Sequence, residues 1–466
     1  MRMWAHEIAV ATGGELIGPD VSVDGASIDS RDLVDGSLFV PIVDVRDGHD
    51  FIELALERGA SAFLTQRSLA ETPELAQAAM NAGVAAIMVD DTAGALMALG
   101  RAAADRLAHA PGFVGVAGIT GSVGKTTTKD QLAASLATTF ATAASLRSFN
   151  NELGVPLTLI NAPDRTVVSV VEMAAKGRGH IALLCDIAQP TIGIVTAIEM
   201  VHTEMFGSMS EVAAAKAELV EALPATGTAF LNADDPLVAA MADRTNASVM
   251  WWSAAGSPAF IGAPTPDLWA SAVTIDDQLH PSFHLHTPWG ESDVRLGVRG
   301  RHNVGNALAA AGAALALGVT LEGVATGLAG SVMSPWRMDL QTSVGGALIL
   351  NDSYNAGPAS MAAALRALKA LDVPSHVAVL GVMAELGDGG IEAHQSIADL
   401  ANELDIRVIA IDAPNYGPTV EHVADRTAAV ELLCATGAPG VGQAILVKGS
   451  RVAALEVVAA SLLIAT

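Results

Sequence analysis

Cysteine and basic residues are scarce in this chain of 466 residues, and long apolar runs are missing. The two cysteines, Cys185 and Cys434, lie far apart in apolar stretches typical of helices. This placement favours buried free thiols over a disulfide and fits a cytoplasmic protein. No apolar run reaches the length of about 18 residues that a transmembrane helix needs, so we expect no stable membrane association. Residues 1–7 also lack the apolar core of a signal peptide.

The shortage of positive charge narrows the range of partners. The chain has 25 Lys and Arg against 50 Asp and Glu, which gives a formal net charge of −25. Such acidity argues against nucleic acid as a partner, because the phosphate backbone is repelled. An anionic substrate would need a locally basic site. At about 150 residues per domain, the length predicts three domains.

The most informative motif in the sequence is a glycine-rich stretch from Gly118 to Thr128. An apolar run from Phe113 to Ile119 predicts a buried strand before it, and residues 129–140 predict a helix after it. Within it stands the short pattern Gly-x-x-Gly-Lys-Thr, because Ile119 occupies the place of the first glycine in the longer form. Such a turn curls backbone N–H groups around phosphate oxygens, and the helix N-terminus adds a positive dipole end. Lys125 can reach the β- and γ-phosphates, and Thr126 can bind Mg²⁺.

Alternating strands and helices predict an α/β protein with three domains. Residues 1–95 should form a small α/β domain, with strands at 37–40, 62–65 and 85–89. Residues 96–330 should form a central P-loop domain with a parallel sheet. Within it, residues 248–300 alternate as in Ser282-Phe283-His284-Leu285-His286, which predicts an antiparallel hairpin region. Residues 331–466 should form a doubly wound domain, with strands at 347–350, 377–380, 408–411 and 444–447.

Polar residues follow three of the predicted strands. The β-branched run from Thr166 to Val171 ends at Glu172, where ligands bind in open α/β sheets. Glu172 is therefore a candidate Mg²⁺ ligand, with a glutamate merely leaving the sheet as the alternative. Asp352 follows the strand at 347–350, with a plain turn or cap residue as the alternative. His202 follows the apolar run at 191–198, with an ordinary loop histidine as the alternative.

Other charged residues have ordinary interpretations of equal weight. Lys216 lies on a predicted helix at 211–223 and has the pattern of a surface charge. Lys448 and Arg451 follow the last strand, where they could bind a phosphate or carboxylate or simply be solvated. Arg31 and His49 are either turn and cap residues or ligand contacts.

In this order, the segments resemble the Mur ligase family along nearly the whole chain, and most closely its MurF type. The resemblance rests on Gly121–Thr128, Asn150–Pro156, Glu172–Met173, His202, Ala215–Glu218, Asn232–Pro236, Gly300–Asn303, Trp336–Asp339 and Asp352–Asn355. It implies an ATP-dependent carbon–nitrogen ligase that forms a peptide bond through an acyl phosphate in peptidoglycan precursor synthesis. The implied substrates are UDP-N-acetylmuramoyl-tripeptide and D-alanyl-D-alanine. The third domain would be a mobile lid that carries the dipeptide, and we expect a cytoplasmic monomer.

The resemblance also implies roles for individual residues. Catalysis would depend on Lys125, Glu172, His202, Lys216 and Arg337. ATP would contact Gly121, Ser122, Val123, Gly124, Lys125, Thr126, Thr127, Asn303 at adenine, Arg337 at a phosphate and Asp352 at ribose. Two Mg²⁺ ions would be bound by Thr126, Glu172, His202 and Lys216. Lys216 would be carbamylated, which turns a cation into an anionic oxygen ligand. The substrates would contact Ser30, Arg31, His49, Asn150, Asn151, Asn355 and Lys448.

Four positions depart from the family pattern. Ala174 occupies a position where the family usually has glycine, and Ala197 and Gly357 occupy positions where asparagine is usual. Val382 occupies a position where an acidic residue is usual. The metal and phosphate groups are retained, so we expect ATP chemistry to persist. The alternatives are a MurE-like or folylpolyglutamate synthetase-like ligase, a P-loop ATPase coupled to motion, and a nucleotide-binding scaffold without catalysis.

Overall fold

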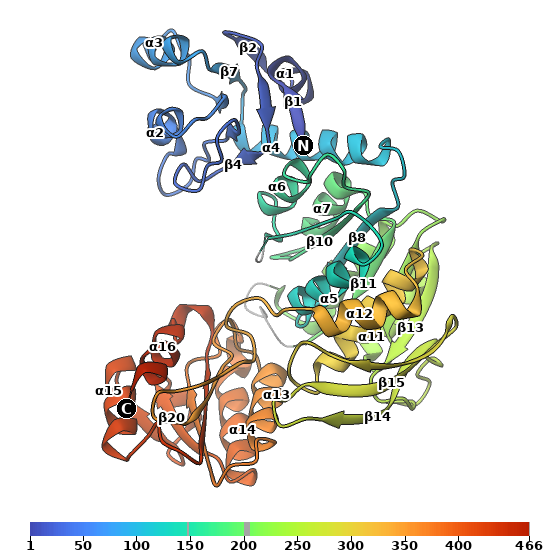
Figure 1. Cartoon of the computed structure of the whole chain (residues 1–466), viewed down its shortest axis with the longest axis vertical. Coiled ribbons are helices and arrows are strands. Elements are labelled where there is room, and N and C mark those ends of the chain that lie inside the picture. Colours follow the sequence, from blue (N-terminus) through green and yellow to red (C-terminus); the bar gives the residue numbers. More distant parts are fainter. Residues whose placement is uncertain (147–148, 200–205, 466) are drawn as a thin grey trace.

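The computed structural model describes residues 1–146, 149–199 and 206–465. Within these ranges the chain forms three successive α/β units, each built around its own sheet, which run from blue through green to red in Figure 1. The α/β fold class expected from the sequence is confirmed. None of the helices in the described part of the chain is long and apolar enough to cross a membrane.

The N-terminal unit is built on a mainly parallel sheet with the strand order β2-β7-β6-β5-β4. A small antiparallel pair, β1–β3, lies beside it. The strands are β1 (Arg2–Trp4), β2 (Glu15–Ile17), β3 (Ser22–Asp24), β4 (Ala26–Ser27), β5 (Leu38–Phe39), β6 (Ala62–Thr65) and β7 (Ala85–Met88). The helices are α1 (Ala5–Thr12), η1 (Gly48–Phe51), α2 (Ile52–Glu57) and α3 (Pro73–Ala82). The predicted strands at 37–40, 62–65 and 85–89 correspond to β5, β6 and β7.

Helix α4 (Thr92–Ala108) leads from this unit into the next and is capped by the Asp91 side chain. It packs on α6 (Gly154–Ile160) so closely that a Cβ atom on Gly100 would lie 2.6 Å from Cβ of Pro156. The Asn161 amide also binds the backbone of Ala26, accepting from its N–H at 2.8 Å and donating to its oxygen at 2.9 Å. The N-terminal unit is therefore fastened to the middle one by packing and by hydrogen bonds.

The middle unit has a mixed sheet with the order β16-β15-β14-β13-β12-β11-β8-β10-β9. Strands β8 to β14 are paired in parallel, and β14, β15 and β16 are antiparallel. The antiparallel hairpin region predicted for 248–300 is therefore confirmed for β14 to β16 but is wrong for β13, which pairs in parallel with β12 and β14. The strands are β8 (Gly115–Thr120), β9 (Thr142–Ala144), β10 (Val168–Glu172), β11 (Ile192–Val195), β12 (Thr228–Asn232), β13 (Ser248–Ser253), β14 (Leu268–Ile275), β15 (Pro281–Thr287) and β16 (Gly290–Arg295).

Helices cover both faces of this sheet. One core includes residues of α6 (Gly154–Ile160), α7 (His180–Ala188) and α9 (Met209–Glu221), and the other includes residues of α5 (Lys125–Ala137), α11 (Asn303–Ala316) and α12 (Leu321–Gly330). Figure 1 shows α5, α11 and α12 side by side. Two short helices, α10 (Pro236–Ala239) and η2 (Ala240–Arg244), follow β12.

The C-terminal unit has the strand order β17-β18-β22-β19-β20-β21, parallel except for β17. The strands are β17 (Asp339–Thr342), β18 (Leu348–Asn351), β19 (Ser375–Leu380), β20 (Arg407–Ile411), β21 (Glu421–Val423) and β22 (Gln443–Lys448). The helices are α13 (Pro358–Lys369), η3 (Gly387–Gly389), α14 (Gly390–Glu403), η4 (Pro414–Tyr416), α15 (Arg426–Ala435), η5 (Arg451–Ala453) and α16 (Glu456–Ile464). One core includes α13 and α14 and another α15 and α16, which confirms the doubly wound prediction.

Two local expectations need correction. Cys185 is buried as predicted, but Cys434 is exposed near the end of α15. An apolar helix carries a solvent-facing side as well as a core-facing one, and Cys434 lies on the former. Helix α5 begins at Lys125 rather than Lys129, because the lysine and the three threonines already belong to its first turn.

Candidate active site

The glycine-rich loop between β8 and α5 is held in place by the end of β11. Gly121 has a φ of +143° and Gly124 a φ of +84°, both in the region that favours glycine. A Cβ atom on Gly121 would lie 1.9 Å from the Thr196 hydroxyl oxygen, so only glycine fits there. That hydroxyl donates to the Val123 oxygen at 2.5 Å, and the Ser122 N–H donates to the Ala197 oxygen at 2.7 Å. Thr196 and Ala197 therefore hold the loop through contacts that do not involve the lysine side chain.

Lys125 folds back over this loop. Its ammonium donates to the backbone oxygens of Gly121 at 2.8 Å and Ser122 at 3.1 Å. Loss of solvation lowers the pKa of Lys125, and the charge of Arg337 lowers it further, whereas Glu172 and Glu199 oppose the shift. The side chain thus lies at the point where the sequence predicts bound phosphates, among other charged residues.

Thr126 and Glu172 meet beside the loop. The Thr126 hydroxyl donates to one carboxylate oxygen of Glu172 at 2.8 Å, and the Asn150 amide donates to the other at 2.8 Å. Glu172 ends strand β10 and is 1% exposed. The strand-end carboxylate and the P-loop hydroxyl are thus neighbours, as the topology predicts. Together they offer the oxygen ligands that Mg²⁺ prefers.

Arg337 reaches this cluster from the C-terminal unit. Its guanidinium donates to the Thr126 hydroxyl at 3.1 Å and lies 4.0 Å above the ring centre of Tyr354. Its Nε atom is buried and has no hydrogen-bond partner among the described residues. The flanking residues Trp336 and Met338 have φ values of 63° and 48°, a strained backbone that persists only where the surroundings enforce it. An unused donor held in this way suits an anionic ligand.

Lys216 is buried rather than on the surface as its local pattern suggested. It lies on α9, where its side chain is 3% exposed. Burial lowers the pKa of Lys216 well below its usual value, and the charge of Lys125 acts in the same direction. The neutral amine is therefore favoured. His202, the other expected ligand of a second metal, lies outside the described residues.

Glu199 is a site residue that the sequence reasoning missed. It follows β11, and its backbone oxygen accepts from the Ser122 hydroxyl at 3.2 Å. Its Oε2 atom is buried without a hydrogen-bond partner in the described part of the chain. Burial raises the pKa of Glu199 to about 7, with a further contribution from Asp235, whereas Lys125 opposes the rise. The strand-end rule that found Glu172 on β10 would also have found Glu199, which follows β11, the other neighbour of β8.

We expect Glu199→Gln to stabilise the ligand-free protein in a pH-dependent manner. The folded-state pKa lies above the usual 4.5, so the unfolded chain loses its proton first and stability falls as pH rises between the two values. Glutamine cannot ionise and removes this penalty. The melting temperature of the variant, relative to wild type, should rise clearly at about pH 8 and much less at about pH 5.5.

The exposed Glu74 on α3 supplies the matched control. Glu74→Gln should leave the melting temperature nearly unchanged at both pH values. An equal shift for Glu199→Gln at both pH values would contradict the buried carboxylate.

Asn303 contacts the loop indirectly. Its amide donates to the Arg299 oxygen at 2.6 Å and its oxygen accepts from Asn306 at 2.8 Å. Asn306 lies directly against the loop, since a Cβ atom on Gly124 would be 2.4 Å from its side-chain oxygen. Sequence reasoning missed Asn306, which the i, i+3 spacing on α11 places beside Asn303. The adenine contact of Asn303 stays a prediction.

Asp352 and Lys448 form a buried ion pair in the C-terminal unit. The Lys448 ammonium donates to the Asp352 carboxylate at 2.5 Å and to the Asn355 oxygen at 2.9 Å. The other carboxylate oxygen of Asp352 accepts from the Met338 N–H at 3.0 Å. The Lys448 side chain is 3% exposed and the Asp352 side chain is 13% exposed. Lys448, expected to bind substrate, thus orders the loop after β18, and Asp352 positions the backbone beside Arg337.

We expect Asp352→Asn to weaken ATP use more than use of the UDP substrate, and also to destabilise the C-terminal unit. The unpaired ammonium of Lys448 should cost about 3 kcal/mol. The double variant Asp352→Asn/Lys448→Met removes the stranded charge and should regain much of that stability. Thermal unfolding and the two KM values measure these effects. Fully additive losses in the double variant would contradict the pairing.

The residues expected to contact the UDP-sugar lie in the N-terminal unit and are occupied by neighbours. Arg31 is exposed and donates to Asp29 at 2.7 Å, which lowers the pKa of Asp29 to about 2. The His49 ring is buried, with Nδ1 at 2.6 Å from Asp47 and Nε2 accepting from the Gln66 N–H at 3.1 Å. Ser30 is 6% exposed. In this structure His49 braces its loop and offers no free ring nitrogen, so its contact with substrate stays a prediction.

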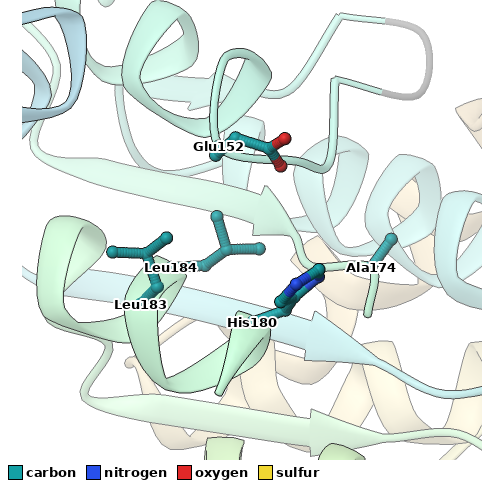
Figure 2. Close-up of a pocket in the computed structure, with 5 residues that line it drawn as sticks. All are labelled: Glu152, Ala174, His180, Leu183 and Leu184. Atoms are coloured by element: carbon teal, nitrogen blue, oxygen red, sulfur yellow. The ribbon is translucent and has the colours of Figure 1, made fainter. Parts of the chain in front are cut away.

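Asn150 and Asn151 also have local partners. Asn150 holds Glu172, and the Asn151 side chain accepts from the Gly154 N–H at 2.9 Å at the start of α6. Next to them lies a pocket of ≈ 210 Å³ lined by Glu152, Ala174, His180, Leu183 and Leu184. Figure 2 shows Glu152 and His180 on opposite sides of this pocket, with the two leucines projecting from α7. The departure Ala174 therefore shapes a pocket wall two residues beyond Glu172.

The other departures have local explanations. Ala197 contributes its backbone oxygen to the loop, which needs no asparagine side chain. Gly357 precedes α13 and donates its N–H to the Ser360 hydroxyl at 3.0 Å. Val382 contributes a backbone oxygen that accepts from the Ser450 N–H at 2.9 Å.

Comparisons with known proteins agree with this geometry. Residues 119–314 match the Mur ligase middle domain, and residues 336–451 match the Mur ligase, glutamate ligase domain. The UDP-N-acetylmuramoyl-tripeptide–D-alanyl-D-alanine ligase of Mycobacterium tuberculosis is 38% identical over 509 aligned positions, which cover 98% of each chain. A crystal structure of MurF from Acinetobacter baumannii is 28% identical and superposes with a TM-score of 0.83 over 99% of both chains. The MurF ligase of Thermotoga maritima, solved in complex with ADP, is 25% identical, with a TM-score of 0.75 over 94% of this chain and 97% of that one.

A phosphate loop, a strand-end glutamate and an arginine from a doubly wound C-terminal unit define an ATP-dependent ligase, and the chain belongs to the Mur ligase family. Within that family it groups with the MurF type, as the full-length relatives show.

Proposed function

We propose that the protein joins D-alanyl-D-alanine to UDP-N-acetylmuramoyl-tripeptide at the expense of ATP, in peptidoglycan precursor synthesis. The relatives' name supplies the two substrates. The observation that carries the proposal is the convergence of Thr126, Glu172 and Arg337, which brings the middle and C-terminal units together at the phosphate loop.

The residues present fit a nucleotide and Mg²⁺. Gly121 and Gly124 leave a cradle that side chains would fill, and the buried Nε of Arg337 has no hydrogen-bond partner in the ranges that the structure describes. Thr126 and Glu172 would hold the first Mg²⁺, and His202 with a carbamylated Lys216 would hold a second. Bound Mg²⁺ neutralises charge on phosphoryl oxygens. The lowered pKa of Lys216, caused by burial, supports carbamylation because only the neutral amine takes up CO₂.

The chemistry follows from the weak electrophilicity of a carboxylate. ATP phosphorylates the tripeptide carboxylate to an acyl phosphate, and ADP leaves. The neutral amine of the dipeptide then attacks the acyl carbon, phosphate departs with the bonding electron pair, and the amine loses a proton. Lys125 and Arg337 neutralise negative charge that builds up on the transferred phosphoryl group. The C-terminal unit, through Arg337, completes this site only when it lies against the middle unit.

The three domains divide the work in this proposal. Residues 1–95 bind the UDP-sugar through Ser30, Arg31 and His49, and residues 96–330 bind ATP. Asn150 and Asn151 guide the muramoyl part towards Glu172, next to the pocket at Ala174. Residues 331–466 supply Arg337 and Asp352 to ATP, and Asn355 and Lys448 to the substrates. The protein acts in the cytoplasm as a monomer.

Phosphate release from ATP tests the proposal. With UDP-N-acetylmuramoyl-tripeptide present, release should require D-alanyl-D-alanine and should match formation of the pentapeptide product. Equal release with a single amino acid in place of the dipeptide would favour a MurE-like ligase, and release with a folate substrate would favour a folylpolyglutamate synthetase-like one. Nucleotide binding without release under any of these conditions would identify a non-catalytic relative.

A further inference from the structure

Two histidines and two carboxylates share one exposed face of the β15–β16 hairpin. His284 and His286 are two residues apart on β15, so their side chains project to the same side of the sheet. The alternate residues Phe283 and Leu285 face the core and are 4% and 0% exposed. The strand register places Glu291 directly opposite His286 and Asp293 directly opposite His284. Strands β14, β13, β12 and β11 separate β15 from the phosphate-loop strand β8. This spacing is roughly 24 Å, so the cluster is separate from the ATP site.

Glu291 brings the two imidazoles together. Its carboxylate lies 3.2 Å from Nε2 of His284 and 2.9 Å from Nδ1 of His286. One potential ligand atom from each of the three residues lies within 4.8 Å of the other two. Two imidazole nitrogens and one carboxylate oxygen around a common point form the donor set of many zinc sites, with a fourth position left to water.

The remaining ring nitrogens already have partners. Nδ1 of His284 lies 2.8 Å from Asp293, and Nε2 of His286 lies 2.8 Å from the Ser271 hydroxyl on β14. The indole of Trp269 stacks on His286 with ring centres 4.7 Å apart, which holds the ring plane. Histidines that bind metals donate their other N–H to a carboxylate or another acceptor, which fixes the tautomer and orientation. Here both outer nitrogens have such an acceptor.

We propose that His284, His286 and Glu291 bind a divalent transition-metal ion, best matched by Zn²⁺, with Asp293 and Ser271 as positioning residues. The mixed nitrogen and oxygen ligands suit Zn²⁺ rather than Mg²⁺, which prefers oxygen. The ion would bind the ring nitrogens that face Glu291, while the opposite N–H groups donate to Asp293 and Ser271. The ion ties β15 to β16, the edge strand of the sheet.

Zinc titration of the full-length protein tests the site. The active site is first saturated with Mg²⁺ and ADP, and Zn²⁺ is then titrated against a chromogenic chelator. Wild type should bind one Zn²⁺ ion per chain that His284→Gln/His286→Gln does not bind, and ligase activity should be unchanged because the cluster lies outside the ATP site. Asp293→Asn should keep the stoichiometry and weaken binding about 10- to 100-fold, through the loss of one positioning hydrogen bond.

His6 provides the matched control. It pairs with Asp20 at 2.8 Å on the surface, a single histidine–carboxylate pair, so His6→Gln should leave Zn²⁺ binding unchanged. A second measurement uses melting temperature: Zn²⁺ should raise that of wild type but not that of Glu291→Gln. Equal Zn²⁺ binding by wild type and the double histidine variant, or no binding by wild type, would overturn the proposal and leave the cluster as surface ion pairs.

Discussion

Lys125→Ala is expected to reduce ligation about 10²- to 10³-fold or more, while the folded structure remains intact. The phosphoryl group that is transferred would lose the positive charge that the Lys125 ammonium supplies. The loop should keep its shape, because Thr196 and Ala197 hold Val123 and Ser122 independently of the lysine. The measurement is kcat for pentapeptide formation together with the melting temperature.

Lys125→Met separates charge from bulk in the same experiment. It fills the space of the aliphatic chain but carries no charge, so it should be as inactive as the alanine variant. Lys369→Ala, on α13 away from the loop, should retain full activity. Near-normal turnover in a folded Lys125→Met protein would remove the phosphate-loop interpretation.

The fold was largely predictable from local patterns. Parallel strands such as β10 are continuous β-branched runs, and the doubly wound C-terminal unit alternates strands and helices of ordinary length. In the N-terminal unit, β3 and β4 were missed, since they span only three and two residues and carry little periodicity. The unexpected helix α3 starts with Pro73, a residue that also marks turns.

Site residues could be predicted from the sequence where a reactive or metal-binding side chain lies at the end of a predicted strand. Glu172 was identified this way because topology alone brings β10 next to β8. Burial could not be read in the same way: the sequence around Lys216 is that of any amphipathic helix, and only packing shows that the lysine faces inward. Likewise, the ion pair joins Asp352, directly after β18, to Lys448 at the end of β22, far away in sequence.

Several of the few lysines in this acidic chain are buried. Lys216 and Lys448 are almost fully buried, although charged side chains seldom are without a partner. Lys448 has Asp352, whereas the charge that acts on Lys216 is that of Lys125, which is of the same sign. Burial and the like charge of Lys125 both favour the neutral amine of Lys216, which is the form that reacts with CO₂.

Lys216→Ala is therefore expected to be nearly inactive, with a loss similar to that of Lys125→Ala. Without the carbamate, the second Mg²⁺ would lose an anionic oxygen ligand. Because burial lowers the pKa of Lys216, carbamylation should need a less alkaline pH than it would for a solvated lysine. Removal of dissolved CO₂ and bicarbonate should reduce wild-type activity reversibly.

Chemical rescue provides the sharpest test of this role. A short carboxylic acid, such as formate or acetate, should occupy the space vacated in Lys216→Ala and restore part of the activity. The same acid should not rescue Lys125→Ala, where a cation is missing, nor Lys216→Met, where the space is filled. Covalent trapping of the carbamate, followed by digestion and peptide mass spectrometry, should locate the added carboxyl group on Lys216. Full activity of Lys216→Met in a folded protein would rule out the carbamate, because methionine cannot supply an oxygen ligand to a metal ion.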